Sequence, residues 1–196
     1  AAVVSPSGKS AVISVISQNN ELETFLVDLD TTSVVGLGYS LVNAIYSADE
    51  AFIYGSIAQG HKFYIAKISI KDRTTTRFPI SHSYYPVLAL TPDQKRIVAA
   101  NYKFGQGETV FEEYTFDGKK LRSRHFKSEV FQLVPLEIDG REEYLTANFG
   151  GSIQRISLET GEVLQEFAKA SAQNPRISAD GLRLVASGRA GIKIWD

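Results

Sequence analysis

Cysteine and methionine are both missing from the 196 residues of this sequence, and its formal net charge is only −1. Without cysteine there is no disulfide framework, no thiolate metal site and no cysteine nucleophile. A charge so close to zero produces no overall field to attract nucleic acid or an anionic membrane. We therefore expect neither nucleic acid nor a membrane among the partners. The lack of cysteine leaves the redox compartment undetermined, and we favour an intracellular location.

Long hydrophobic runs are missing as well. The apolar stretches are broken by serine, asparagine or lysine, far short of the roughly 20 residues of a membrane-spanning helix. Residues 1–8 contain no basic segment followed by a long apolar one, so they do not resemble a secretory signal. Both ends of the chain fall within predicted strands. Together with the lack of methionine, this suggests an excerpt of a longer polypeptide.

One short turn signature occurs five times along the chain. Its copies begin at residues 5, 47, 91, 137 and 178, so successive copies are 42, 44, 46 and 41 residues apart. They contain proline, which presets φ, aspartate, which bonds its own following backbone, or glycine, which accepts a positive φ. Each copy is therefore predicted to be a two-residue hairpin turn with its flanking residues.

Four short strands are predicted in each repeat. A near-continuous apolar run follows each turn, as in strands covered on both faces, and an alternating strand follows the next polar gap. The predicted fourth strands are 33–37, 74–79, 120–126 and 163–167. The best helical candidate, 158–172, is rejected because Thr160-Gly161 occupies the turn before a fourth strand. The sequence therefore predicts an all-β fold.

Tandem quartets of antiparallel strands with this period are typical of a β-propeller. A four-stranded blade has two apolar faces, and only neighbouring blades can bury both. We predict one β-propeller domain, or a propeller fragment, of about four and a half to five blades. The expected blade boundaries are approximately 1–40, 41–83, 84–128, 129–170 and 171–196, and the last blade lacks its outer strand.

The C-terminal forty residues resemble a known family. Residues 178–188, followed by Gly191-Ile192-Lys193-Ile194-Trp195-Asp196, are similar to the core of a WD40 repeat with its terminal Trp-Asp. Upstream, other residues fill the Trp-Asp position and no Gly-His dipeptide precedes a first strand, so the sequence resembles a degenerate WD40-like β-propeller. The Thr-Gly-Glu-Val-Leu pattern at 160–164 also occurs in quinoprotein-like propellers, and both subfamilies stay open.

The resemblance implies an incomplete ring. WD40-like propellers usually have seven blades, and one chain end completes the blade that the other begins, whereas this chain opens on an inner strand. We favour a fragment of a larger ring over an unusual small ring with an incomplete blade. An open arc leaves two apolar blade faces bare. A further propeller segment or another chain that completes the ring is therefore an expected partner.

No catalytic or metal-binding pattern is found. His61, His82 and His125 lack metal-ligand spacing. The adjacent acids at 112–113 and 142–143 lie on predicted strands, where neighbouring side chains point to opposite faces and cannot form a glycosidase pair. There is no Gly-x-Ser-x-Gly elbow and no phosphate-binding glycine loop. We expect no catalytic residue, no metal and no cofactor.

A basic stripe is the first candidate for partner binding. Alternation in 120–126 predicts that Lys120, Arg122 and Arg124 share one face of an outermost strand. Such a stripe would meet an acidic partner or RNA phosphates. The alternative is that these charges only protect an exposed edge strand from aggregation.

Three tyrosines are the second candidate. Tyr39, Tyr84 and Tyr85 precede predicted first strands, in loops that line one mouth of a propeller ring. Tyrosine is a common anchor at protein interfaces. Packing between blades is the alternative for each of them.

The predicted function is a non-catalytic scaffold for protein–protein interaction, which presents loop and rim surfaces to partner proteins. This expectation depends on the resemblance and on the lack of a catalytic pattern, because a fold does not dictate function. The alternative is an enzyme or small-ligand propeller, quinoprotein-like or hydrolytic, with its site on the central axis. That class needs polar side chains from the first strands, which are mostly apolar here. A regulatory propeller within a multidomain protein is a third possibility.

Overall fold

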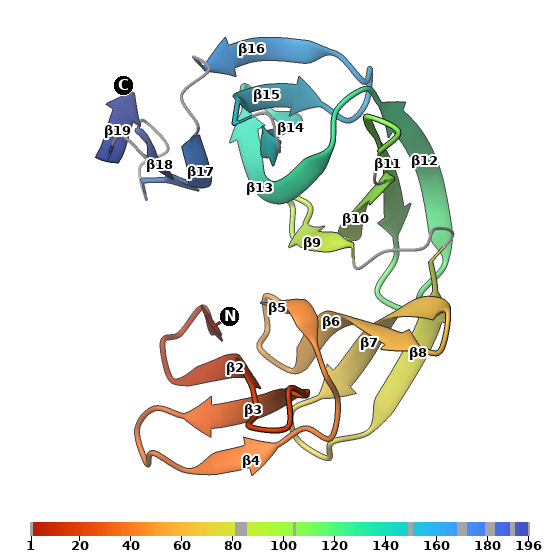
Figure 1. The fold of residues 1–196 in the computed structure, drawn as a ribbon, viewed down its shortest axis with the longest axis vertical. Helices are drawn as coiled ribbons and strands as arrows, with labels where there is room; N and C mark the ends of the chain where they lie inside the picture. Colours follow the sequence, from red (N-terminus) through yellow and green to blue (C-terminus); the bar gives the residue numbers. More distant parts are fainter. Residues whose placement is uncertain are drawn as a thin grey trace. The chain divides into compact units, whose positions relative to one another are not determined.

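The computed structural model describes residues 2–80, 86–103, 105–148, 151–167, 172–178, 183–188 and 191–195. The regular secondary structure of these residues consists of β-strands alone. The strands form five separate antiparallel sheets (Figure 1). Four sheets have four strands and the last has three. The predicted all-β fold of small four-stranded sheets is therefore confirmed. The chain divides into two compact units, residues 1–88 and 89–196, and each is described by itself.

The first unit contains two sheets in which each strand pairs with the next along the chain. The strands of the first sheet are β1 (Ala2–Val4), β2 (Ser10–Ile16), β3 (Leu22–Asp28) and β4 (Val34–Gly36). Those of the second are β5 (Val42–Tyr46), β6 (Phe52–Gln59), β7 (Lys62–Ser69) and β8 (Thr75–Pro79). Short turns favour this order, because a tight turn can join only antiparallel neighbours.

The remaining three sheets repeat the same order. The third sheet consists of β9 (Val87–Leu90), β10 (Ile97–Lys103), β11 (Glu108–Tyr114) and β12 (Lys120–Phe126). The fourth consists of β13 (Val130–Ile138), β14 (Arg141–Asn148), β15 (Ile153–Ser157) and β16 (Val163–Phe167). The fifth consists of β17 (Ala172–Ile177), β18 (Leu184–Gly188) and β19 (Gly191–Trp195). The strand β16 confirms that the segment after Thr160-Gly161 is extended and not helical.

An apolar cluster joins the two sheets of the first unit. Val12 and Leu26 of the first sheet pack with Ile53 and Ile68 of the second. Leu41, in the connection between the two sheets, is almost completely buried in the same cluster. This cluster covers one face of sheet β1–β4.

The opposite face of sheet β1–β4 is also apolar. Strand pairing places Val4, Ala11, Val27 and Val34 in one row across this face. Val4 and Val34 are 56% and 59% exposed. The sheet therefore has two apolar faces, as the repeat pattern predicts, and the first unit covers only one of them.

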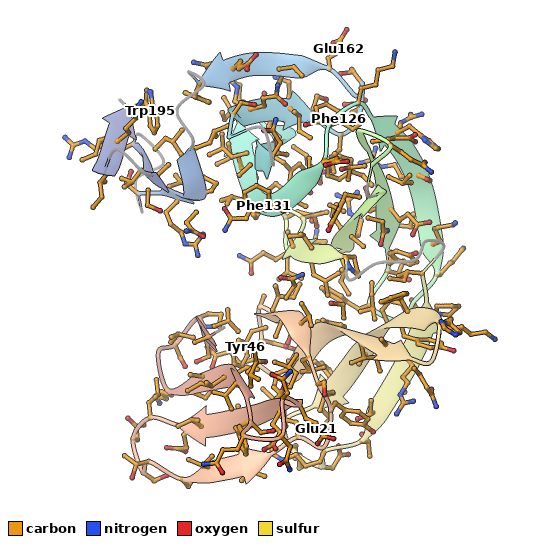
Figure 2. The ribbon with its side chains drawn as sticks, viewed as in Figure 1. Glu21, Tyr46, Phe126, Phe131, Glu162 and Trp195 are labelled. Carbon is orange, nitrogen blue, oxygen red and sulfur yellow. The ribbon has the colours of Figure 1, made fainter. Side chains whose placement is uncertain are left out.

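Both apolar and charged contacts join the sheets of the second unit. Leu145 and Ile153 pack with Leu184 and Ala186 of the last sheet. The rings of Phe167 and Trp195 meet edge to face with centroids 6.1 Å apart. Trp195, on the last strand, is labelled in Figure 2. These contacts bury one face of the three-stranded sheet, the face with Leu184 and Ala186.

Ionic contacts join sheets β9–β12 and β13–β16. Nη1 of Arg96, just before β10, lies 2.6 Å from Oε1 of Glu113, and its Nη2 pairs with Glu142 on β14. Nε of Arg122 lies 2.6 Å from Oε2 of Glu113. Glu113 is buried, so removal of either arginine would leave a poorly compensated buried charge.

The repeated turn signatures lie at hairpin tips, but most are not two-residue turns. Four copies share one arrangement, in which a backbone N–H donates to the carbonyl five residues later: Ser5 to Ser10, Ser47 to Phe52, Thr91 to Arg96 and Ser178 to Arg183, at 2.8 to 2.9 Å. In each of these, the hydroxyl of the first residue accepts a hydrogen bond from the backbone N–H of that later residue. In the fourth copy along the chain, Asp139-Gly140, both with positive φ, form a two-residue turn. The two-residue prediction is wrong for the other four because a serine or threonine hydroxyl closes a wider loop; in the last of them the loop residues 179–182 lie outside the described residues.

Candidate functional site

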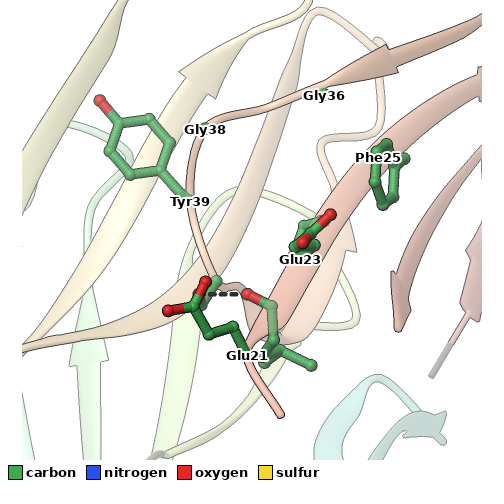
Figure 3. Close-up of a pocket in the computed structure, with 9 residues that line it drawn as sticks. Glu21, Glu23, Phe25, Gly36, Gly38 and Tyr39 are labelled. Atoms are coloured by element: carbon green, nitrogen blue, oxygen red, sulfur yellow. Dashed lines mark hydrogen bonds between the residues drawn. The ribbon is translucent and has the colours of Figure 1, made fainter. Parts of the chain in front are cut away.

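A groove of about 670 Å³ opens at one end of sheet β1–β4 (Figure 3). The start of β3, the end of β4 and the segment that follows β4 line it. Its carboxylate and aromatic side chains are Glu21, Glu23, Phe25 and Tyr39. All of its lining residues belong to the first unit. One of the tyrosines singled out from the sequence, Tyr39, is therefore part of a groove.

Hydrogen bonds hold the segment after β4 against β3. The Leu37 amide donates to the Thr24 carbonyl, and the Leu41 amide donates to Oγ1 of Thr24, both at 2.9 Å. Oγ of Ser14 donates to the Leu41 carbonyl at 2.9 Å. Ser14 and Thr24 are buried, where hydrogen bonds are stronger than in water. The groove wall is therefore fixed before any ligand arrives.

Tyr39 has two roles in this wall. It is partly buried against the apolar cluster of the first unit, so packing accounts for part of its position. The Arg77 guanidinium lies 5.1 Å from the centroid of its ring, within the range of a cation–π contact. The Thr75 hydroxyl and the Arg77 guanidinium lower the pKa of the Tyr39 phenol. The aromatic ring is thus held in a defined orientation beside the groove.

Glu21 and Glu23 give the groove a negative charge. Both side chains are exposed, and neither forms an ion pair with another residue in the described ranges. No lysine or arginine is among the described residues that line the groove. Glu23 and Phe25 project from the same face of β3 because they are two residues apart. The groove therefore offers free carboxylates next to an aromatic surface.

The predicted basic stripe is divided between two faces. In the pairing of β11 with β12, Lys120 lies opposite Tyr114 and Arg122 lies opposite Glu113, with a β-bulge at this step. Opposed residues share a face, so Lys120 and Arg122 point to opposite faces. Nζ of Lys120 accordingly lies 3.1 Å from the buried Glu112 carboxylate, on the other side from Glu113. The prediction of a single face is wrong because the bulge interrupts the alternation.

The other predicted binding residues have different outcomes. Arg124 is exposed and lies opposite Phe111, on the same face as Arg122. Tyr84 and Tyr85 lie outside the described residues. Partner binding by the six residues chosen from the sequence therefore stays a prediction, and of the four that the structure describes only Tyr39 lines the groove.

The adjacent acids on β11 and β14 point to opposite faces, as predicted. The Glu112 carboxylate accepts a hydrogen bond of 2.8 Å from the Tyr114 hydroxyl, whereas Glu113 binds the arginines described above. On β14, Glu142 binds those arginines and Glu143 pairs with Arg155 on another strand. The two acids of each adjacent pair therefore form different contacts on opposite faces of their sheet.

Within the described residues, no group of three or more histidine, aspartate or glutamate side chains is arranged to hold a metal ion. Nδ1 of His125 pairs with Glu108. His61 is exposed in the turn between β6 and β7, and His82 lies outside the described residues.

The carboxylates and Phe25 of the groove were not predicted from the sequence. Their signal is the alternate spacing of Glu21, Glu23 and Phe25, which begins directly before β3 and continues along one face of it. Tyr39 comes later in the chain, and only the pairing of β3 with β4 brings it close to them. The sequence pattern alone does not show that these residues share a groove.

Solved structures show a similar fold. The β-propeller domain of Cps50 (Swd1) from Myceliophteria thermophila matches with a TM-score of 0.68 at 12% identity, over 95% of this chain and 62% of that chain. The fold is a β-propeller, as predicted. Hydrazine synthase from Kuenenia stuttgartiensis matches with a TM-score of 0.66 at 18% identity, over 94% of this chain and 53% of that chain. At such identities the likeness concerns the fold alone.

No family model and no curated protein sequence matches the chain. The chain spans between one half and two thirds of the two solved chains given above. In the part of the molecule that is described, there is no helix able to cross a membrane.

Proposed function

We propose that this chain is a protein-interaction module that binds a basic segment of a partner protein in the groove beside β3. The observation that carries the proposal is the position of the free carboxylates Glu21 and Glu23 next to Phe25 and Tyr39 in one groove. A lysine or arginine side chain complements both features, because its charge suits the carboxylates and its aliphatic stem packs on aromatic rings. The similarity to the Cps50 propeller domain supports this proposal through the fold.

The five sheets support the division of this interaction module into blades. We place the blade boundaries at approximately 1–40, 41–83, 84–128, 129–170 and 171–196, as the sequence repeat suggests. In this division each blade contains one sheet of the structure. The groove belongs to the first blade.

A peptide with lysines at alternate positions tests the groove. We choose the labelled peptide Gly-Lys-Thr-Lys-Val-Gly, because an extended strand then presents both lysines on one face, as β3 presents its acids. Each exposed ion pair contributes up to about 0.7 kcal/mol at low salt. The double variant Glu21→Gln/Glu23→Gln should therefore weaken binding roughly tenfold in fluorescence anisotropy.

The control is the double variant Glu137→Gln/Glu159→Gln, which changes the net charge equally at two exposed acids of the second unit. Its affinity for the peptide should stay within about twofold of the unaltered chain. Added NaCl should reduce the difference between the two double variants, because these charges are exposed. Equal losses in both would mean that the peptide senses overall charge and not the groove, and the proposal would be abandoned.

A further inference from the structure

The outer strands β12 and β16 of the second unit each contain a β-bulge at their second residue. In β12, the residues on either side of Leu121 lie opposite successive residues of β11, so Leu121 is the extra residue. In β16, the residues on either side of Leu164 lie opposite successive residues of β15, so Leu164 is the extra residue. The pairing of β8 with β7 is regular throughout. Consecutive sheets of the second unit thus carry a leucine at the same position of their fourth strand.

Both bulge leucines lie at the edge of their sheet and are exposed. Leu121 is 45% exposed and Leu164 is 41% exposed, and Val163 beside Leu164 is exposed as well. A bulge interrupts the hydrogen-bond ladder of a strand and redirects the side chain of the extra residue. An interrupted edge is poorly suited to pairing with another strand, so a contact made here depends on side chains.

The charges around the two leucines have opposite signs. Lys119 and Arg124 are exposed beside the leucine of β12. Glu162 and Glu166 are exposed beside the leucine of β16. None of these four side chains forms an ion pair with another residue in the described parts of the chain. One outer edge is therefore basic and apolar, and the next is acidic and apolar.

The two edges complement each other across a two-fold axis. They are the outermost strands of neighbouring sheets in one unit, and the Arg96–Glu142 ion pair joins these sheets (Figure 1). In a two-fold interface the same surface of both subunits takes part, so each contact occurs twice. An axis between β12 and β16 brings the basic edge of each copy against the acidic edge of the other. Contact between two edges of the same sign is disfavoured, because like charges across an interface repel.

We propose that two copies of this chain associate through these edges, with Leu121 of each copy packed against Leu164 of the other. The bases of β12 then face the acids of β16. A second copy is the partner because the surface that complements the basic edge is present on the same unit. Apolar contact provides the affinity, and the charges select the crossed arrangement. This interface belongs to the second unit and is separate from the groove of the first unit.

Sedimentation equilibrium of the 196-residue chain at low salt measures the association. The average mass should rise from that of one chain towards that of two as the concentration increases to about 500 µM. Leu121→Ser and Leu164→Ser should each raise the dissociation constant of the dimer at least about tenfold, because each removes two apolar contacts per dimer. Leu29→Ser, at a similarly exposed leucine of the first unit, should leave the dissociation constant unchanged.

Paired charge reversals test the crossed arrangement. Lys119→Glu/Arg124→Glu gives both edges exposed acids, and Glu162→Lys/Glu166→Lys gives both edges exposed bases. Each variant alone should stay monomeric, because like charges then face each other. An equimolar mixture of the two should form a mixed dimer, because both crossed contacts again join opposite charges. Circular dichroism of each variant should match the unaltered chain, because all four side chains are exposed.

Three results would overturn the proposal: the mass of one chain throughout the concentration range, an equal dissociation constant for Leu121→Ser and the unaltered chain, or no mixed dimer from the two reversed variants. Glu21→Gln/Glu23→Gln should dimerise like the unaltered chain, and the leucine variants should bind the lysine peptide like the unaltered chain. The two proposals can therefore fail independently.

Discussion

Two buried tyrosines of the second unit should respond in opposite ways to the same substitution. Tyr114 and Tyr144 are 2% and 1% exposed. The Tyr114 hydroxyl donates a hydrogen bond of 2.8 Å to the buried Glu112 carboxylate. The Tyr144 hydroxyl is buried and has no hydrogen-bond partner among the residues that the structure describes. Replacement by phenylalanine removes one oxygen from each and leaves the ring in place.

The expected changes in the free energy of unfolding follow from these contacts. A hydrogen bond to a charged group contributes about 1.5–3 kcal/mol, so Tyr114→Phe should destabilise the chain by about that amount. Tyr144→Phe removes a hydroxyl that pays a desolvation penalty without a bond, so it should be neutral or stabilise by up to about 1 kcal/mol. The two variants should therefore differ by at least about 1.5 kcal/mol.

Urea unfolding followed by circular dichroism measures this difference. Both variants should keep the slope of the unfolding free energy with urea, so that the midpoints alone report stability. An equal loss in Tyr144→Phe and Tyr114→Phe would refute the reasoning, because it would mean that the two hydroxyls have equivalent surroundings.

Alkaline pH provides an independent check on Tyr144. Burial raises the pKa of its hydroxyl above the ordinary value of 10.0. A raised folded-state pKa gives stability that is fully present below the unfolded pKa and is lost as the pH rises past about 10, because only the unfolded tyrosine ionises there. Tyr144→Phe should reduce this alkaline loss. An unchanged loss in the variant would contradict the assignment to Tyr144.

Two further predictions concern the packing of the first unit and the ionic contacts of the second. Gly55→Ala should destabilise the chain by about 1–3 kcal/mol, because a Cβ at Gly55 would lie 3.0 Å from Cδ2 of Leu41, which anchors the groove wall. It should also weaken binding of the lysine peptide to the groove. Thermal melts and the anisotropy assay measure the two effects, and an unchanged melting temperature would show that Leu41 shifts without cost. Arg96→Met should destabilise the chain by about 2 kcal/mol. A double-mutant cycle with Glu142→Gln should give a coupling free energy of about 0.5–1 kcal/mol between the two sheets. A coupling of zero would mean that the Arg96–Glu142 pair does not stabilise the contact between these sheets.

The strand pattern could be predicted closely from the sequence because it depends on local features. The predicted fourth strands at 120–126 and 163–167 are the strands β12 and β16 with the same bounds. Alternation and turn residues act over a few neighbouring positions, and both can be read directly from the chain. Even the opposite orientation of Glu112 and Glu113 follows from this local rule.

Features that depend on pairing between strands could not be predicted in this way. The bulge that separates Lys120 from Arg122 is a property of two strands, and the sequence of β12 alone does not contain it. The four-residue loops likewise depend on hydroxyl groups that meet an amide across the hairpin.

The sequence by itself determined the repeat, the strands and the two apolar faces of each sheet, because these follow from the order of side chains along an extended backbone. Only the tertiary structure decided which charges meet and which stay free. Glu113 pairs with two arginines, while Glu21 and Glu23, near Tyr39, form no ion pair within the described part of the chain. The physical reason is that charge pairing depends on distance in space, which strand register and loop closure set.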